Sequence, residues 1–187
     1  MQVNFMLTAR DIPNMISIAR IILVFPIVWL LLTGEFKSAM LLFFVAGVSD
    51  ALDGFLATHY GWQSWLGGIL DPLADKFLLI STYLCLGWLG ALPWWLIGVV
   101  ALRDVVIVGG ALLYNYRIAH VSAEPTLISK LNTLLQIVLA LAVVYDLGFT
   151  PLPAPLVTVL IWSVVATTLL SGMGYVLDWG RRARQQG

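Results

Sequence analysis

Residues 41–76 read LLFFVAGVSDALDGFLATHYGWQSWLGGILDPLADK, in which two apolar runs each carry a pair of acidic residues. The four acids are Asp50, Asp53, Asp71 and Asp75. A carboxylate near the centre of a membrane helix costs about 2.5–3.5 kcal/mol on insertion scales, so four of them cost on the order of 10 kcal/mol. Lys76 is the base that stands next to one of them in sequence. Such acids need a further compensating partner.

The spacing of the acids predicts a site for divalent metal. Asp53 follows Asp50 by three residues, and Asp75 follows Asp71 by four. Both spacings place a pair on one face of a helix. Two such pairs on neighbouring helices form a cluster of hard oxygen ligands, which Mg²⁺ or Mn²⁺ prefers, commonly with phosphate oxygens in the same shell. Because two divalent ions cancel four negative charges, we predict a site for two ions of Mg²⁺ or Mn²⁺.

Small residues lie between the two acidic pairs. Gly54 follows Asp53, Ala57 comes one turn later, and Gly67 precedes the second pair. Lack of bulk beside metal ligands lets a diphosphate approach the backbone. Close packing of membrane helices through small residues is the alternative reading of each position alone. Next to four acids, we favour the diphosphate.

The composition indicates that this chain is surrounded largely by lipid rather than by water. Of its 187 residues, 60% are hydrophobic and 11% are charged, and the mean hydropathy is +0.94. Soluble domains carry about 25% charged residues, so most of this surface must face lipid. Ten basic and ten acidic residues balance, and nothing in the overall charge indicates nucleic-acid binding.

We predict an all-α integral membrane protein with six transmembrane helices in a single domain, residues 1–187. A span needs about 20 mostly apolar residues. The apolar stretches lie near 13–33, 38–59, 68–90, 93–117, 127–147 and 153–178. Residues 2–11 are expected to form a short interfacial segment, and we expect no cleavable signal peptide, because no convincing cleavage site follows the first apolar run.

Basic residues predict the orientation, since cytoplasmic loops are enriched in them. With six spans, both termini share one side. That side holds Arg10, Arg117, Arg181, Arg182 and Arg184, and the other holds Lys37. We therefore expect both termini and the acidic site on the cytoplasmic side, in the inner membrane of a bacterium.

Written out, the acidic stretch is Asp50-x2-Asp53-Gly54-x2-Ala57-Thr58-x8-Gly67-x3-Asp71-x3-Asp75. It resembles the signature of the CDP-alcohol phosphotransferase family at every position but one, where that family has Arg and this chain has Thr58. The resemblance implies six membrane helices, with the motif bridging the second and third. It also implies homodimers, which are usual for that family.

The resemblance further implies roles for individual residues. The four acids would hold two metal ions around the diphosphate of CDP-diacylglycerol, and Asp75 would also be the general base for the acceptor hydroxyl. Arg20 fits the same pattern on the first span. The residues implied to bind the lipid nucleotide are Pro13, Asn14, Gly54, Ala57, Thr58, Ser64 and Gly67.

Thr58 is a departure with a chemical consequence, because threonine cannot neutralise part of a diphosphate as arginine does. Arg20, Arg103, Lys130 or His59 could cover that charge. Otherwise the activity is weaker or the substrate is altered. For His59 we favour an interfacial position with no catalytic task.

The second half of the chain resembles CMP-forming cardiolipin synthases in Arg103-Asp104-Val105 and in Pro125-Thr126-x2-Ser129-Lys130-x-Asn132-Thr133-x2-Gln136. This implies phosphatidylglycerol as the acceptor and cardiolipin as the product. Phosphatidylglycerophosphate synthases, which use glycerol 3-phosphate, share the segment 71–76 and are the alternative. A phosphate-bearing acceptor needs cations, and Arg103 and Lys130 are the candidate ligands. A pair with a nearby acid, such as Arg103 with Asp104, would instead satisfy the buried charge without a ligand.

We therefore expect an enzyme of phospholipid synthesis that transfers a phosphatidyl group and releases CMP. Two other classes of protein fit the acids less well. A cation transporter explains carboxylates within membrane helices but not the spacing of the small residues. A catalytically weak family member that only binds the lipid nucleotide is compatible with Thr58.

Overall fold

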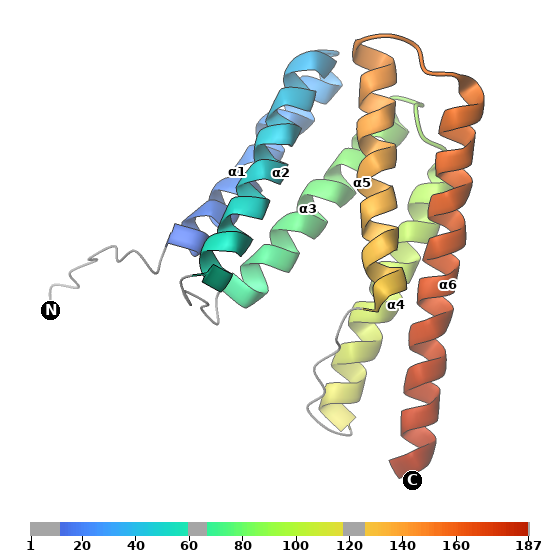
Figure 1. Ribbon diagram of the computed structural model, residues 1–187. Helices are drawn as coiled ribbons and strands as arrows, with labels where there is room; N and C mark the ends of the chain where they lie inside the picture. Colours follow the sequence, from blue (N-terminus) through green and yellow to red (C-terminus); the bar gives the residue numbers. More distant parts are fainter. Residues whose placement is uncertain (1–11, 60–66, 118–125, 187) are drawn as a thin grey trace, which may run out of the picture. The chain divides into compact units, whose positions relative to one another are not determined.

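The computed structural model describes residues 12–59, 67–117 and 126–186, and side chains within 14–50, 52, 70–107, 109 and 126–175. The described residues form six helices and no strand (Figure 1). The helices are α1 (Ile12–Leu32), α2 (Phe36–His59), α3 (Gly67–Trp88), α4 (Trp94–Arg117), α5 (Leu127–Gly148) and α6 (Ala154–Gln186). The all-helical prediction is confirmed, and the backbone of α6 continues beyond the apolar stretch that was expected to end near residue 178. The expected interfacial segment, residues 2–11, lies outside the described part.

Within the described residues, three helices are long and apolar enough to cross a bilayer. These stretches are Asn14–Leu32 of α1, Leu127–Gly148 of α5 and Ala154–Tyr175 of α6. The described side chains of α3 include Asp71, Asp75 and Lys76, which lower its apolar content. Membrane-spanning helices are thus present, and six spans remain a prediction.

Glycines end two of the helices where the chain turns. Gly34 and Gly90 have positive φ angles of 82° and 72°, a conformation that glycine adopts without strain. The Glu35 N–H donates to the Leu30 carbonyl at 2.8 Å, and the Ala91 N–H donates to the Leu86 carbonyl at 2.9 Å. These are Schellman motifs, and they allow tight reversals after α1 and α3.

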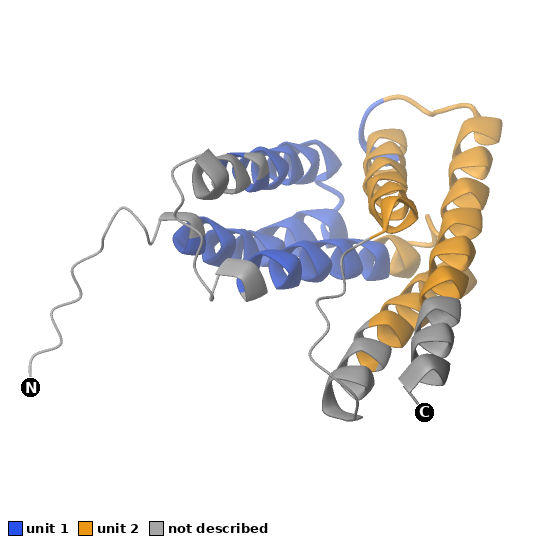
Figure 2. Ribbon diagram, turned by 60° about the horizontal axis from the view of Figure 1, so that its bottom comes forward, with its two compact units in different colours: residues 1–85, 147–149 blue, residues 86–146, 150–187 orange. Residues whose placement is uncertain are grey.

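The chain divides into two compact units (Figure 2). Unit 1 contains residues 1–85 and 147–149, and unit 2 contains residues 86–146 and 150–187. In unit 1, α1 packs against α2; in unit 2, α4 packs against α6. The single-domain prediction is not tested by this division.

Each unit has a helix with one buried stripe. On α1 the buried positions are Ser17, Arg20, Val24, Ile27 and Leu31, whose spacing of three and four residues marks one face. On α5 the stripe is Ser129, Asn132, Gln136, Leu139, Ala140, Val143 and Val144. Both stripes begin with polar residues and continue with apolar ones, so each unit buries its polar groups near one end of a helix.

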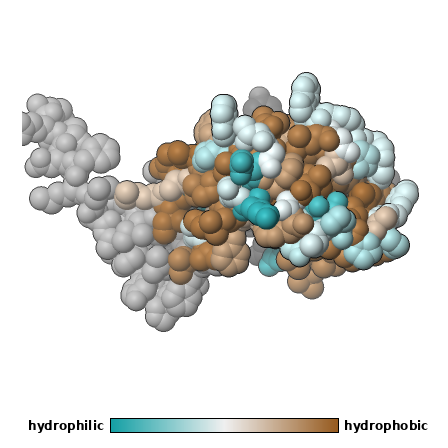
Figure 3. Space-filling view, turned by 90° about the horizontal axis from the view of Figure 1, so that it is seen from above, coloured by the Kyte–Doolittle hydropathy of each residue, from teal (hydrophilic) through white to brown (hydrophobic). Residues whose placement is uncertain are grey.

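Large apolar side chains cover much of the described surface (Figure 3). Phe25, Trp29, Phe44 and Trp162 are each more than 60% exposed. In water such a surface would favour aggregation, whereas lipid tails solvate it. The surface therefore agrees with the membrane helices identified from length and composition.

Candidate active site

Two polar residues of α1 gather acids from the next two helices within unit 1. The Ser17 hydroxyl donates a hydrogen bond to Asp71 Oδ1 on α3. Arg20 Nη1 lies 2.6 Å from Asp75 Oδ1 and 2.5 Å from Asp50 Oδ1 on α2. The same guanidinium nitrogen thus bridges carboxylates of α2 and α3, and Asp50, Asp71 and Asp75 share one polar cluster.

The cluster is buried on its α1 side and open on its acidic side. The Arg20 side chain is 1% exposed, whereas those of Asp50 and Asp75 are 44% and 51% exposed. A buried guanidinium is stable when ion pairs and hydrogen bonds satisfy it. Arg20 therefore forms the floor of the cluster, and the carboxylates form a surface that a ligand can reach.

Among the described contacts of this cluster, the carboxylates outnumber the cations. Arg20 contributes one positive charge to Asp50, Asp71 and Asp75, which contribute three negative ones. Hard oxygen donors with excess negative charge suit a divalent ion such as Mg²⁺ or Mn²⁺. Among the described side chains, however, no three acids, histidines or cysteines stand in a ready metal-ligating arrangement. The donor chemistry of these carboxylates fits a divalent ion, and Asp53, the fourth predicted ligand, has its side chain outside the described part.

Several predicted site residues lie outside the described side chains. Asp53 is on α2, one turn after Asp50, and its side chain lies outside the described part. So do those of Pro13, Gly54, Ala57, Thr58, His59 and Gly67, whose backbone is helical, while Ser64 is wholly outside the described part. Asn14, one turn before Ser17 on α1, is half-buried.

The sequence analysis missed Ser17 and the partners of Arg20. A signal was present, because Asn14, Ser17 and Arg20 recur every three residues on an otherwise apolar helix. That spacing puts them on one face. Which acids they meet depends on the packing of α1 with α2 and α3, which spacing within α1 does not specify.

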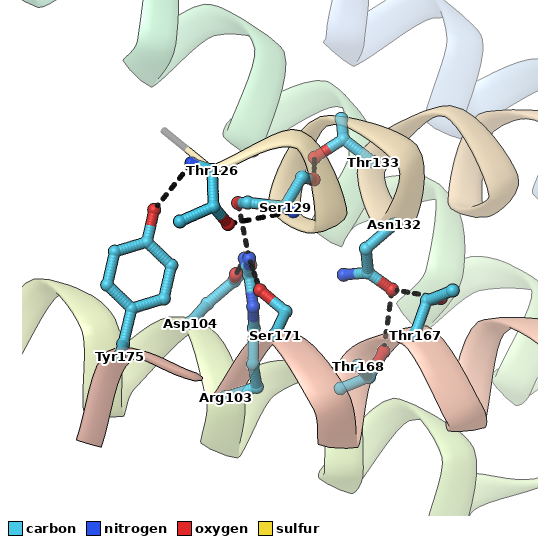
Figure 4. Close-up of polar contacts among 10 residues, drawn as sticks. All are labelled: Arg103, Asp104, Thr126, Ser129, Asn132, Thr133, Thr167, Thr168, Ser171 and Tyr175. Atoms are coloured by element: carbon cyan, nitrogen blue, oxygen red, sulfur yellow. Dashed lines mark hydrogen bonds and ion pairs between the residues drawn. The ribbon is translucent and has the colours of Figure 1, made fainter. Parts of the chain in front are cut away.

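A second polar cluster lies within unit 2, around Arg103 of α4 (Figure 4). Arg103 Nη1 donates to Asp104 Oδ1 at 2.8 Å. Nη2 donates to the hydroxyls of Ser129 on α5 and Ser171 on α6, at 2.5 and 2.6 Å. All four residues are buried, with Arg103 7% and Asp104 8% exposed. This is the paired arrangement named above as the alternative to ligand binding.

The start of α5 is fixed beside this cluster. The Thr126 hydroxyl accepts a hydrogen bond from the Ser129 N–H at 3.2 Å, as an N-cap residue does. One turn further, Asn132 Oδ1 accepts hydrogen bonds from the hydroxyls of Thr167 and Thr168, each at 2.9 Å. The polar residues of the second resemblance thus join α4, α5 and α6.

Lys130, the other predicted ligand of the acceptor phosphate, differs from Arg103. It follows Ser129 on α5 and is exposed.

The stem of Arg103 lines a pocket of about 450 Å³ between α4 and α6, together with apolar residues such as Leu102 and Met173. Its guanidinium points instead toward Ser129 and Asp104 (Figure 4).

Comparison with known proteins gives a family match that covers most of this chain. A family model described as CDP-alcohol phosphatidyltransferase matches residues 10–170, which include the acids of unit 1 and Arg103, Asp104 and Ser129 of unit 2. The chain belongs to the CDP-alcohol phosphatidyltransferase family. The resemblance stated from the acidic signature is confirmed.

Individual members of the CDP-alcohol phosphatidyltransferase family are similar over most of the chain. A probable CMP-forming cardiolipin synthase of Drosophila melanogaster is 35% identical over 181 residues, 88% of this chain and 52% of the relative. The chloroplastic CDP-diacylglycerol–glycerol-3-phosphate 3-phosphatidyltransferase 1 of Oryza sativa subsp. japonica is 33% identical over 187 residues, 90% of this chain and 57% of the relative.

The CMP-forming cardiolipin synthase of Homo sapiens is 35% identical over 147 residues, 70% of this chain and 49% of the relative. The chain therefore spans about half the length of these relatives. Both branches named in the sequence analysis occur among them.

Proposed function

We propose that this chain transfers a phosphatidyl group from CDP-diacylglycerol to an alcohol and releases CMP. The observation that carries the proposal is the gathering of Asp50, Asp71 and Asp75 by Ser17 and Arg20, in a chain that belongs to this family. An accessible acidic surface formed by residues of α2 and α3 is suited to a diphosphate substrate with its accompanying cations.

In the proposed reaction, the acceptor hydroxyl attacks the β-phosphorus of CDP-diacylglycerol. A new phosphorus–oxygen bond forms, the bond to the CMP oxygen breaks, and the hydroxyl proton passes to Asp75. Asp75 is suited to this role because its carboxylate is 51% exposed and lies on the accessible side of the acidic cluster. A general base of this kind contributes about 10²–10⁴-fold to the rate.

Asp50, Asp53, Asp71 and Asp75 would hold two divalent ions, Mg²⁺ or Mn²⁺. When bound, these ions neutralise charge on the diphosphate and on the leaving CMP. The residues proposed to contact the lipid nucleotide are Pro13, Asn14, Gly54, Ala57, Thr58, Ser64 and Gly67. Asn14 is supported by its place one turn before Ser17 on the face of α1 that meets the acids.

The proposed acceptor is phosphatidylglycerol, which gives cardiolipin. The fly and human relatives named as cardiolipin synthases support it. For the acceptor phosphate we propose Lys130, which is exposed, and Arg103, whose Nε–H has no hydrogen-bond partner among the described residues. The rice relative, named for glycerol 3-phosphate, supports that smaller acceptor as the alternative.

The proposed setting is the bacterial inner membrane, with six spans, a cytoplasmic active site and a homodimeric assembly. Three spanning helices and a lipid-compatible surface support membrane insertion. The basic residues near both termini and Arg117 support the orientation. Cysteines introduced at Arg10 and Lys37 test it, because a membrane-impermeant thiol reagent added outside intact cells should label only position 37.

Product analysis tests the reaction. Purified protein in detergent is incubated with CDP-diacylglycerol, Mg²⁺ or Mn²⁺, and either phosphatidylglycerol or glycerol 3-phosphate, and lipids and CMP are identified by mass spectrometry. Cardiolipin with equimolar CMP is the expected result. Phosphatidylglycerophosphate instead identifies the alternative acceptor.

The same preparations separate the two other classes of protein. Binding of the lipid nucleotide without CMP release from any acceptor identifies a binding protein. Cation flux through reconstituted vesicles without CMP release identifies a transporter. Either result rejects the proposed enzyme.

A further inference from the structure

A single nitrogen occupies the position between two carboxylates of the acidic cluster. Arg20 Nη1 lies within 2.6 Å of both Asp50 Oδ1 and Asp75 Oδ1. Oxygen ligands of Mg²⁺ lie at about 2.0–2.1 Å from the ion. The guanidinium group and a divalent ion are both positively charged, and both need the space beside these two carboxylate oxygens. They therefore compete for the same position.

Arg20 is well placed to release these two carboxylate oxygens while its side chain stays in the site. Its side chain is 1% exposed and arises from α1, one turn after Ser17, which holds Asp71 independently. A small rotation of the guanidinium frees the carboxylates, while the stem stays anchored. The five N–H donors of a guanidinium form forks that match phosphate oxygens, so a displaced Arg20 has a second class of partner close to the acids.

We propose that Arg20 exchanges partners: it joins Asp50 to Asp75 until a divalent ion takes their oxygens, and it then binds the substrate diphosphate. This inference rests on the metal site of the proposed function. It also assigns to Arg20 the diphosphate charge that the family's arginine supplies where this chain has Thr58.

The exchange predicts the sign of a metal-binding change. If Arg20 competes with the ion, its removal strengthens metal binding; if Arg20 only holds the acids in place, its removal weakens it. The first measurement is Mn²⁺ binding to the purified protein without lipid nucleotide, from the electron paramagnetic resonance signal of free Mn²⁺. Arg20→Met should bind Mn²⁺ at least about 10-fold more tightly than the unaltered protein, since a charge-assisted hydrogen bond to each acid no longer has to be broken.

Lys37→Met is the matched control for lost positive charge in unit 1. Lys37 is in the first turn of α2, exposed over the Phe149 ring, thirteen residues before Asp50. Its removal should leave Mn²⁺ affinity unchanged. An equal gain in both variants shows an effect of net charge alone and overturns the exchange.

Arg20→Lys covers the case in which Arg20→Met does not fold. Lysine keeps the competing charge, so Mn²⁺ affinity should stay within about threefold, but it lacks the fork, so the Mn²⁺-dependent affinity for CDP-diacylglycerol should fall about 10-fold. Unchanged affinity for the lipid nucleotide overturns the inference.

The remaining outcomes separate this inference from the proposed function. Mn²⁺ binding by the unaltered protein, with equal or weaker binding by Arg20→Met, rejects the exchange and leaves the metal site standing. An unaltered protein that neither binds Mn²⁺ nor releases CMP rejects both.

Discussion

The two buried arginines have opposite surroundings, although both are paired with aspartate. Arg20 bridges Asp50 and Asp75, whose side chains are 44% and 51% exposed. Arg103 pairs with Asp104, whose side chain is 10% exposed, and it also donates to two buried serine hydroxyls. The cluster in unit 1 has an excess of negative charge and is accessible, whereas Arg103 and Asp104 balance each other and are enclosed.

This difference teaches how to separate a reactive cluster from a structural one. A buried ion pair with balanced charge mainly avoids the penalty of an unpaired ion. An open cluster with unbalanced charge still has favourable interactions to make with a cation. Substitutions in unit 1 should therefore alter chemistry first, and substitutions at Arg103 should alter stability first.

The largest expected effect is at Asp75. Asp75→Asn keeps the shape of the side chain but cannot accept the acceptor's proton, so CMP release should fall about 10²–10⁴-fold. Folding and Mn²⁺-dependent binding of the lipid nucleotide should persist. Asp146→Asn is the control, because Asp146 accepts a hydrogen bond from the Leu152 N–H in the turn after α5, at 2.6 Å, and an amide oxygen can still accept it. Full activity of Asp75→Asn would contradict its role as base.

Removal of Arg103 should have the next largest effect, this time on stability. Arg103→Ala leaves Asp104 buried without its cation, which should lower the free energy of unfolding in detergent by about 3–5 kcal/mol. The double variant Arg103→Met/Asp104→Leu removes both charges and should recover most of that loss.

The double variant also tests whether Arg103 binds the acceptor phosphate or is only structural. If Arg103 is only structural, the folded double variant keeps its KM for phosphatidylglycerol. A raised KM with unchanged stability supports Arg103 as a ligand of the acceptor phosphate. Equal stability of Arg103→Ala and the unaltered protein argues against a closed cluster.

Addition of Mn²⁺ should stabilise the protein through unit 1. At a free concentration 100 times the Kd, one bound ion adds about 2.7 kcal/mol, seen as a rise in Tm that a chelator reverses. Asp71→Asn should reduce this rise, because it removes a carboxylate charge from the cluster. Asp104→Asn should melt at a lower temperature but keep the Mn²⁺-dependent rise; an equal reduction in both variants would contradict the contrast between the clusters.

The smallest effect is expected at Thr168. Its hydroxyl donates to Asn132 Oδ1 at 2.9 Å, and interhelical hydrogen bonds of this kind contribute about 0.6 kcal/mol on average in membrane proteins. Thr168→Val should lower unfolding stability by about that amount and leave turnover unchanged. Thr158→Val is the control, because the exposed Thr158 hydroxyl donates to the Ala154 carbonyl of its own helix.

The sequence was sufficient to locate the helices, because runs of apolar residues separated by Gly, Pro and charge are a strong signal. The expected range 13–33 compares with Ile12–Leu32, and 127–147 with Leu127–Gly148. For the last helix, the expected apolar stretch 153–178 compares with the membrane-length stretch Ala154–Tyr175. The prediction stopped where the apolar run stops, but Arg, Ala and Gln favour helix, so the backbone continues to Gln186.

The partners of the charged residues were less predictable. Adjacent Arg103 and Asp104 could be paired from sequence, since they are neighbours in the chain. Arg20 and Asp75 are 55 residues apart, and spacing along α1 reveals a polar face without revealing what it meets. The acids could be recognised as a group because two spacings and a family signature agree. Their contact with Ser17 and Arg20 is a property of how α1 packs.

The distance in sequence between Arg20 and its acids has a consequence for biosynthesis. At about 5–20 residues per second, a ribosome adds Asp75 roughly 3–11 s after Arg20. During that interval the first span must enter the bilayer with an arginine whose later partner has not been made. Because Arg20 lies in the first half of α1, its long side chain can extend toward the headgroups during that interval. When the third helix is inserted, Asp75 pairs with the guanidinium of Arg20 inside unit 1. The completion of unit 1 therefore has to wait for this helix.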